Sequence, residues 1–337
     1  MRGDLAPIAR RLAEEGRDAL VARVISFSGV GGRRAGETLI LSDDGQAHGS
    51  LLGDLGERAL ADSPLSPGAG ALLLELVLEE GEARRAGLAC GGTARVAVSE
   101  LGAVPKEVWG ALERGQAVAL VSRIGQGGTL AVLDQPAERS RLVLGSLGDE
   151  RLDETALGEA TKGLRSGRES ALLITEGPLA PAFFEVLVPS TTLYILGTGE
   201  LVTALGAQAR LLGWSVAAYE AYDSQMELSL QSLGPADALV VLLHDHDEAT
   251  PALAAGLRAG CYVGALGSRH TQAGRRRRLA GEGLSEEELA RLHGPVGLDL
   301  GARTPEETAL CIAAEILSFR TGRPATSLSR SRGPING

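Results

Sequence analysis

Short, continuously apolar runs alternate with helix-like segments in the second half of the chain. The apolar runs are "TLYIL" at 192–196, "SVAAYE" at 215–220, "DALVVLLH" at 237–244 and "CYVGALG" at 261–267. Continuously apolar strands separated by helices are typical of a parallel sheet that is buried on both faces. We therefore predict a Rossmann-like, doubly wound α/β domain over residues 190–322, with capping boxes at 285–288 and 304–307 that begin its last helices.

The first half has a different pattern, with strands that follow one another more closely. An amphipathic helix is predicted at 4–16, strands are predicted at 19–27 and 37–45, and another apolar run lies at 71–78. Three short stretches recur in the same order: "ALVARV" with "ALVSRI", "GSLLGD" with "GSLGDE", and "ALLLE" with "ALLIT". We interpret residues 1–182 as an α+β domain built by internal duplication, with repeats at about 1–100 and 105–180.

Composition narrows the class of protein. The formal charge of −10 argues against general binding to nucleic acid, because proteins that bind a phosphate backbone carry basic surfaces. The chain has three widely separated cysteines, which fits a reducing compartment rather than a disulfide framework. It has no signal-peptide pattern and no apolar stretch of membrane-spanning length, so we expect a cytoplasmic protein with a disordered tail at 323–337.

The segment "LYILGTGELVTALG" at 193–206 contains most of a dinucleotide-binding fingerprint. Gly197 would allow the tight turn out of the strand, and Gly199 would let the backbone approach a pyrophosphate at the helix N-terminus. Glu220 ends the next strand, where an acidic residue can accept hydrogen bonds from ribose hydroxyls. Val202 replaces the third glycine, and Glu200 places a carboxylate beside the expected phosphate. The alternative is a strand-to-helix turn that binds nothing.

Two further strand ends are predicted to reach the same edge of the sheet. His244 and Asp245 follow one strand and are candidate ligand contacts, although a metal site is disfavoured because adjacent residues of a strand point to opposite faces. After the next strand, Gly264, Gly267, Ser268 and Arg269 form a second turn suited to an anion, with Arg269 able to bind a phosphate through two bonds. The run Arg275–Arg278 is interpreted as a solvated helix face.

Chemistry in the first half is less defined. Cys90 precedes two glycines and is either an accessible thiol or a small apolar core residue. No nucleophile elbow, CxxC pair, HExxH motif or P-loop occurs, so the sequence assigns no catalytic residue and no metal ligand. From the residues alone, an NAD(P)-dependent oxidoreductase and a non-catalytic nucleotide-binding scaffold both stay open.

The chain resembles the XdhC/CoxI family, the accessory proteins of xanthine dehydrogenase and related molybdenum hydroxylases. In the second half the resemblance lies in "LYILGTGELVTAL", "LLHDHD", "YVGALGSRHT", "RRLAGEGLSEEELARL" and "PVGLDLGARTPEETALCIAAEI". In the first half it is looser and lies in "VARVISFSGVGGRRAGETLILSDDG", "HGSLLGDLGE" and the "CGG" at 90–92.

This resemblance implies a chaperone rather than an enzyme. Such a protein would bind the molybdenum cofactor, as molybdopterin or its dinucleotide, hold it during sulfuration and deliver it to a xanthine dehydrogenase-like hydroxylase. A cysteine desulfurase is a further implied partner, and a homodimer is one assembly to consider. The cofactor-binding residues would be those given above, and we expect the oxygen-sensitive metal centre to lie in a crevice between domains.

The first half departs from the family pattern. The family's Gly-Ser-x-x-Gly-Gly-Cys segment reads "GSLLGDL" here, so Asp54 and Leu55 stand where a glycine and a cysteine are expected. The histidine usual after the second glycine of the nucleotide loop is Glu200. If a thiol of this chain contacts the molybdenum, Cys90 is the candidate that remains in the first half, since sulfurated molybdenum favours thiolate ligands.

Overall fold

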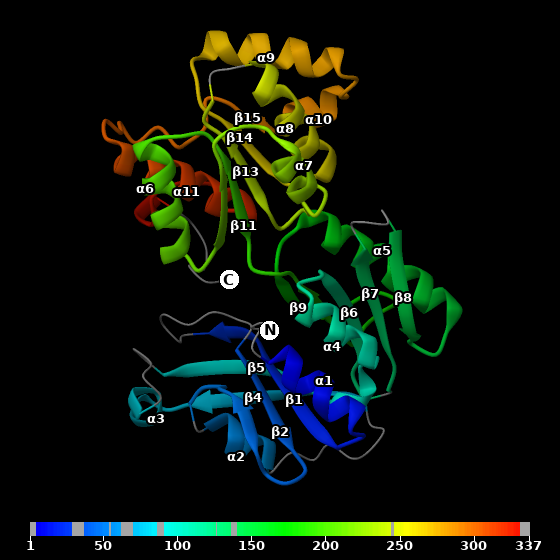
Figure 1. Ribbon diagram of the computed structural model, residues 1–337. Helices are drawn as coiled ribbons and strands as arrows, with labels where there is room; N and C mark the ends of the chain where they lie inside the picture. The colour runs from blue at the N-terminus through cyan, green and yellow to red at the C-terminus, as the bar shows by residue number, and fades with distance from the viewer. Residues whose placement is uncertain are drawn as a thin grey trace.

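The computed structural model describes residues 5–28, 37–53, 55–61, 70–85, 91–125, 127–135, 140–243 and 246–330. These ranges contain three five-stranded sheets, of which the first two are antiparallel and the third is parallel (Figure 1). The predicted fold class, an α+β half followed by a Rossmann-like parallel sheet, is confirmed.

The first sheet and its helices form what we call lobe 1. Its elements are α1 (Ala6–Glu14), β1 (Ala19–Ser28), β2 (Thr38–Ser42), β3 (Ala47–Gly49), α2 (Leu55–Ala61), β4 (Ala71–Leu78), α3 (Glu80–Arg85) and β5 (Gly92–Glu100), and a 3-10 turn, η1 (Leu101–Ala103), follows. The strands are ordered β3-β2-β1-β5-β4. Helix α1 begins at a proline-bearing first turn and buries Ala6, Ala9 and Leu12, which share one helical face.

The second sheet and its helices form lobe 2. Its elements are α4 (Lys106–Glu113), β6 (Val118–Arg123), β7 (Thr129–Gln135), β8 (Ser140–Ser146), α5 (Glu150–Ser166), β9 (Ser170–Ile174) and β10 (Ala182–Leu187). Asp149 caps the N-terminus of α5 through the backbone N–H groups of Arg151 and Leu152, and Gly167 ends it in the left-handed conformation.

The two lobes share one topology. In each, a helix precedes three strands, a second helix follows, and two further strands complete the sheet. The strand order β8-β7-β6-β10-β9 repeats the order of lobe 1 position by position. This agreement supports the internal duplication that the sequence echoes predict, while the domain boundaries at 182 and 190 stay predictions.

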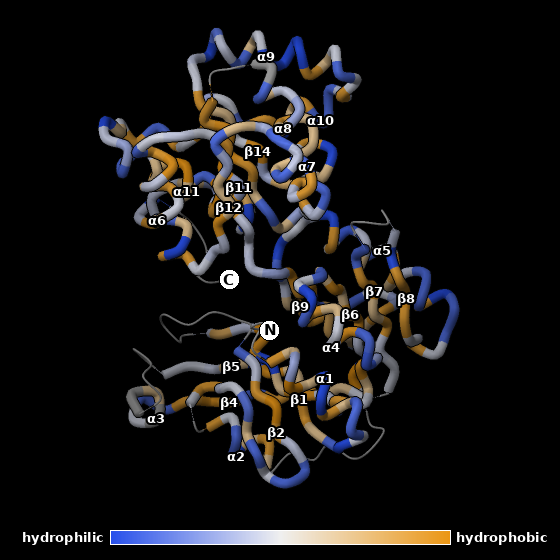
Figure 2. Tube along the Cα trace, in the orientation of Figure 1, coloured by the Kyte–Doolittle hydropathy of each residue, from blue (hydrophilic) through white to orange (hydrophobic). Residues whose placement is uncertain are grey.

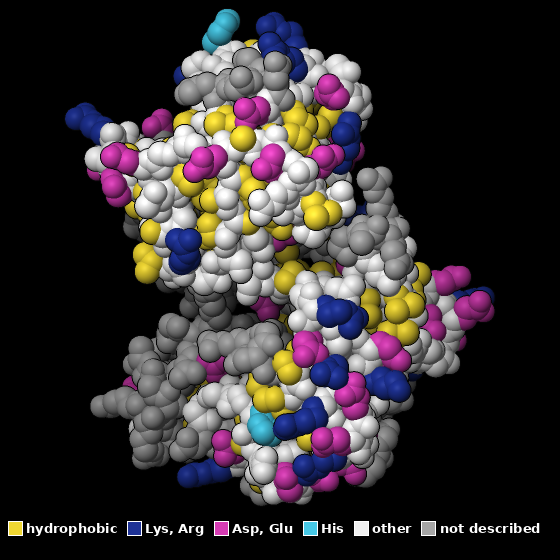
Figure 3. Space-filling model, in the orientation of Figure 1, with side chains coloured by type: hydrophobic (Ala, Val, Ile, Leu, Met, Phe, Trp, Pro, Cys, Tyr) yellow, Lys and Arg dark blue, Asp and Glu magenta, His cyan; other side chains and the backbone are white. Residues whose placement is uncertain are grey.

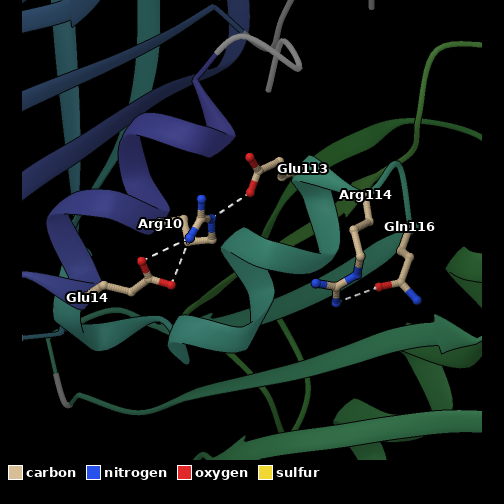
Figure 4. A network of polar contacts seen from close by, with 5 residues as sticks. All are labelled: Arg10, Glu14, Glu113, Arg114 and Gln116. Atoms are coloured by element: carbon tan, nitrogen blue, oxygen red, sulfur yellow. Dashed lines mark hydrogen bonds and ion pairs between the residues drawn. The ribbon is translucent and has the colours of Figure 1, made fainter.

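The lobes pack against each other through a shared apolar core. Val21 and Ile40 of lobe 1 and Leu120 and Ala131 of lobe 2 belong to one cluster, together with buried residues of α1 and α4. Figure 4 shows the polar contacts near this junction, where Arg10 of α1 donates to Glu113 of α4 at 2.6 Å. That ion pair is partly exposed, so the buried apolar side chains supply most of the stabilisation.

One ion pair between the lobes is buried. Arg23 of β1 lies 2.8 Å from Glu185 of β10, measured from Nη2 to Oε2, and each side chain is only 6% exposed. Beside it, Ile25, Ala97 and Phe183 form a small apolar cluster. Both charges have lost their hydration, so each depends on the other for compensation.

The third sheet forms the C-terminal domain. Its elements are β11 (Thr192–Leu196), α6 (Glu200–Leu211), β12 (Ser215–Tyr219), α7 (Ser224–Leu230), β13 (Ala238–Val241), α8 (His246–Ala259), β14 (Tyr262–Ala265), α9 (Arg269–Gly281), α10 (Glu286–Ala290), β15 (Leu292–His293) and α11 (Pro305–Thr321). The strand order is β12-β11-β13-β14-β15. Helices α6 and α11 cover one face of the sheet and α7 and α8 cover the other. Figure 2 shows the resulting apolar strands enclosed by more polar helices.

The structure differs from the predicted elements mainly at their ends. Helix α8 begins at His246 rather than 250, and β13 ends at Val241 rather than 244. Helix α7 was not predicted, because its "SQMELSL" sequence buries only Met226 and Leu230 and gives little periodic signal. Of the predicted tail, residues 328–330 form a 3-10 turn and 331–337 lie outside the described residues. Within the described ranges, no helix has the length and hydrophobicity needed to cross a bilayer.

The buried ion pair predicts an asymmetric response to mutation. Glu185→Gln should lower the free energy of unfolding by about 3–5 kcal/mol, because it leaves the buried Arg23 without a counter-charge. The double variant Arg23→Met/Glu185→Met should recover most of that loss. Urea unfolding followed by circular dichroism measures all three proteins.

A matched control is available on the surface of lobe 1. Arg95 and Glu75 also pair across neighbouring strands at 2.8 Å, but their side chains are about half exposed. Glu75→Gln should cost only about 0–1 kcal/mol. Equal losses for Glu75→Gln and Glu185→Gln would show that burial does not set the strength of the inter-lobe pair.

Candidate functional site

The parallel pairing of the C-terminal sheet aligns four strand ends. Leu196 of β11 is in register with Tyr219 of β12 and with Val241 of β13, and Val241 is in register with Ala265 of β14. The next residue of each strand therefore falls in one row across the edge of the sheet: Glu220, Gly197, Leu242 and Leu266. Helices leave β11 and β13 on opposite faces, so the row contains the switch point where doubly wound sheets bind ligands.

Gly197 lies between Glu220 and Leu242 in this row, and the space there does not admit a larger residue. Its φ is 153°, and a Cβ atom on it would lie 2.8 Å from the Cβ of Leu242. The backbone is held from both sides, since Gly197 N–H donates to Tyr219 O and Leu242 N–H donates to Leu196 O, each at 2.8 Å. Only glycine allows β11 and β13 to stay this close at the point where the segments that follow them diverge.

Gly199 is the N-cap residue of α6. Its φ of 93° and ψ of −171° are accessible only to glycine without strain, and no described atom lies within 4 Å of the position that a Cβ would take. Helix α6 has no side-chain cap, whereas Ser268 caps α9 and Thr304 caps α11. The first N–H groups of α6 and the positive end of its dipole therefore remain available to an anion.

The charged candidates at this edge are exposed. Glu220 and Glu200 flank the Gly197–Gly199 turn, and both are solvent-exposed at strand or helix ends. Arg269 is exposed at the first position of α9, on the far side of β13 from that turn. No hydrogen bond or ion pair with another described residue fixes its guanidinium, so its role as an anion ligand stays a prediction.

Three residues of the second predicted turn have structural explanations. Gly264 lies inside β14, where a Cβ would be 2.5 Å from Val296 Cγ2, so close packing accounts for this glycine. Ser268 Oγ accepts from Thr271 N–H at 3.2 Å and serves as the N-cap of α9. Gly267 has a φ of 133°, which links the strand to that cap. These roles do not require a ligand, and the predicted ligand contacts of the turn stay predictions.

One arginine of α9 is buried, which the sequence pattern did not predict. Arg275 is 1% exposed, so the interpretation of the 275–278 run as a solvated face is wrong at this position. Its Nη2 donates to Leu243 O at 2.6 Å and its Nη1 donates to Leu266 O. Arg276 likewise donates to the carbonyls of Leu289 and Leu292. The signal lay in the helical period, since Gln272, Arg275 and Leu279 share one buried face.

The site lies at the edge of the sheet that faces away from lobe 2. Lobe 2 approaches the opposite edge, where Gly167 packs against Pro235 before β13 and Arg168 packs against Gly322 after α11. Figure 1 shows both lobes beyond the amino ends of the parallel strands, and Figure 3 shows a group of basic side chains at the far end, over α9. Within the described ranges, the Gly197 turn and the lobes of the same chain do not meet to form a crevice, so the expected crevice between domains stays a prediction.

Several candidate residues lie outside the described residues. His244, Asp245 and Cys90 are among these, and so is Asp54. Leu55, which replaces the family's expected cysteine, is the first residue of α2 and packs partly buried against the core of lobe 1. The described residues contain no group of three or more His, Cys, Asp or Glu side chains placed to hold a metal ion.

Family models match two separate parts of the chain. The XdhC Rossmann domain matches residues 193–316, and the XdhC and CoxI family model matches residues 12–65. Together these segments cover slightly more than half of the sequence, and the first coincides with the parallel sheet and its anion-suited edge. The protein is thus a two-part chain whose Rossmann-like domain has a glycine turn at its switch point, and it belongs to the XdhC and CoxI family.

Two curated relatives come from Escherichia coli strain K12. The uncharacterized protein YqeB is 30% identical over 160 residues, which are 42% of this chain and 30% of YqeB. The molybdenum cofactor insertion chaperone PaoD is 29% identical over 133 residues, which are 39% of this chain and 41% of PaoD. The chain therefore matches less than half of the length of either relative.

A solved structure is similar over nearly the whole chain. The crystal structure described as a xanthine dehydrogenase from Bacillus halodurans aligns with 97% of both chains at a TM-score of 0.53. The sequence identity is 18%, so this similarity supports the fold alone.

The conformation of Gly199 predicts separable effects on stability and binding. Gly199→Ala should cost about 1–2 kcal/mol of unfolding free energy through backbone strain. It should also weaken binding of inorganic pyrophosphate at least tenfold, or ~1.4 kcal/mol, because the methyl group enters the open space above α6. Calorimetric titration measures binding, and urea unfolding measures stability.

Gly213→Ala is the matched control for this experiment. Gly213 follows the other end of α6 with a φ of 76°, and it also has no described atom within 4 Å of its Cβ position. It should lose similar stability and keep full affinity for pyrophosphate. If both variants lose affinity equally, strain in the domain, and not the Gly199 turn, controls binding.

The buried cysteines make the reactivity of Cys90 measurable. Cys261 and Cys311 are 1% and 4% exposed, and burial raises the pKa of Cys261 to about 12, so both should resist alkylation at pH 8. Iodoacetamide should label at most one thiol in the folded protein and three in urea, as counted by mass spectrometry. Any label on the folded Cys90→Ser variant would contradict the assignment of the other two thiols as inaccessible.

Proposed function

We propose that this chain is an accessory protein that binds the molybdenum cofactor and passes it to a molybdenum hydroxylase of the xanthine dehydrogenase type. Membership of the XdhC and CoxI family supports this function, and so does the similarity to PaoD, which is described as an insertion chaperone for that cofactor. The observation that carries the proposal is the uncapped α6 behind a glycine turn at the switch point, within the matched Rossmann domain.

The phosphate end of the cofactor fits this edge of the sheet. A pterin phosphate or dinucleotide is an anion, and the free N–H groups at the start of α6 are donors suited to it. Gly199 leaves room for the backbone to approach the phosphate, and Arg269 at the start of α9 would add a positive charge. The exposed Glu220 lies where a nucleotide form would place a ribose.

The molybdenum end of the cofactor needs a ligand other than the phosphate-binding turn. Molybdenum in its sulfurated state favours thiolate contact, and Cys90 is the candidate that we retain for it. We further propose that the chain holds the cofactor while a cysteine desulfurase supplies sulfur. Because the site faces away from lobe 2, shielding of the metal would come from the client hydroxylase or from a second copy of the chain.

Two other functions use the same turn. An NAD(P)-dependent oxidoreductase would bind its dinucleotide at Gly197–Gly199, and a scaffold protein would bind a nucleotide without chemistry. Direct competition distinguishes them. Under anaerobic conditions the purified chain should bind the released molybdenum cofactor at least tenfold more tightly than NAD or NADP.

A transfer assay completes the test. The loaded protein should activate a purified apo-hydroxylase, whereas the same amount of free cofactor should activate it less. Gly199→Ala should lower cofactor retention and activation together, and Gly213→Ala should lower neither. Preferential binding of NAD or NADP, with no cofactor retained, would replace this function with the oxidoreductase.

A further inference from the structure

Arg275 joins the ends of two strands at the candidate site. The hydrogen-bond ladder between β13 and β14 ends with the bond from Leu266 N–H to Val241 O, at 2.9 Å. The segments that follow the two strands then separate. Beyond that point the guanidinium of Arg275 donates one hydrogen bond to each of the two diverging segments, at Leu243 O and at Leu266 O. Leu243 is the last described residue of the segment that follows β13, and Leu266 directly precedes the Gly267–Arg269 turn.

We propose that Arg275 is a positioning residue that sets the spacing between the strand ends at Leu243 and Leu266 and so determines the affinity of the site for its anionic ligand. The proposal rests on the proposed function only for the identity of that ligand. The juxtaposition of one guanidinium with two strand-end carbonyls stands without it.

Burial of this side chain is costly, which argues against a role in packing alone. Arg275 is almost fully buried, loss of hydration lowers its pKa, and its Nε has no hydrogen-bond partner among the described residues. Among the described residues, no carboxylate forms an ion pair with it. An apolar side chain of similar volume would fill the space without burying a charge. The planar guanidinium of Arg275 supplies two hydrogen-bond donors at a fixed separation, which an apolar side chain cannot supply.

Lysine cannot replace arginine at this position, because one side chain must donate to two carbonyls. Lysine keeps the positive charge, but its ammonium is a single point donor and cannot hold two carbonyls in the spacing that a guanidinium fork imposes. A small change in loop position is sufficient to weaken ligand binding, because directional contacts depend on placement within about 1 Å. Arg275→Lys therefore tests the spacing, and Arg275→Met removes the spacing and the charge together.

The experiment compares Arg275→Lys and Arg275→Met with Arg277→Lys and Arg277→Met in the full-length chain. Arg277 lies on the same helix and is exposed, so its variants control for changes in helix composition. Hydrogen exchange is measured on two loop peptides, which cover the described residues 238–243 and 264–270, and peptides from β11 and α11 serve as the internal reference. Anaerobic titration with the released molybdenum cofactor and with inorganic pyrophosphate measures affinity.

We expect both Arg275 variants to accelerate exchange in the two loop peptides while the β11 and α11 peptides keep their wild-type rates. Arg275→Lys should bind pyrophosphate at least tenfold more weakly than the wild type, and Arg275→Met more weakly still. Both Arg277 variants should match the wild type. Wild-type affinity in Arg275→Lys would overturn the proposal, and so would faster exchange spread evenly over the whole domain.

Failure of the proposed function gives a different result. If wild-type protein binds pyrophosphate but not the molybdenum cofactor, the proposed cargo is wrong, and the changes in Arg275 still decide the positioning role. If wild-type protein binds the cofactor and Arg275→Lys binds it equally well, the positioning role is wrong and the cargo stands.

Discussion

The close approach of Gly197 to Leu242 is the contact on which the candidate site depends. A single methyl group at Gly197 would overlap the Leu242 side chain and separate β11 from β13. These two strands form the centre of the parallel sheet, and the helices that follow them leave on opposite faces. In doubly wound sheets, the crevice that binds a ligand forms where two such strands remain paired and then diverge.

Two buried arginines connect parts of the chain that are distant in sequence, and they do so by different chemistry. Arg23 is compensated by the carboxylate of Glu185, so the ion pair contributes to the specific alignment of the two lobes. Arg275 is bonded instead to the carbonyls of Leu243 and Leu266, which hold partial charges only. The first arrangement neutralises a charge inside the protein, whereas the second leaves a guanidinium that has no carboxylate partner in the described part of the chain.

The division of contacts around the C-terminal sheet bears on cofactor transfer. Lobe 2 packs at the amino edge, near Pro235 and Gly322, which leaves the Gly197 edge accessible in the described part of the chain. A carrier that releases its cargo to another protein needs such an accessible edge, while an enzyme that excludes water needs a closed one. This physical requirement favours the accessory role over the oxidoreductase within the proposal.

The sequence by itself determined the local features whose causes are local. The apolar run at 71–78 forms β4 with those bounds, and the capping boxes at Ser285 and Thr304 begin α10 and α11, because periodicity and capping depend on neighbouring residues. The glycines at 197 and 199 were also recognisable, since a strand-to-helix turn with positive φ selects glycine.

The tertiary structure decided what depends on distant partners. Arg275 lies in a run of four arginines, and only the packing of α9 over the ends of β13 and β14 buries it while Arg277 stays exposed. The pairing of Arg23 with Glu185 required two lobes to meet, and the direction of the site away from lobe 2 depended on contacts at Pro235 and Gly322. The helical period places Arg275 on the same face as Leu279, but it does not identify the partners in these arrangements, because those residues are brought together only when the chain folds.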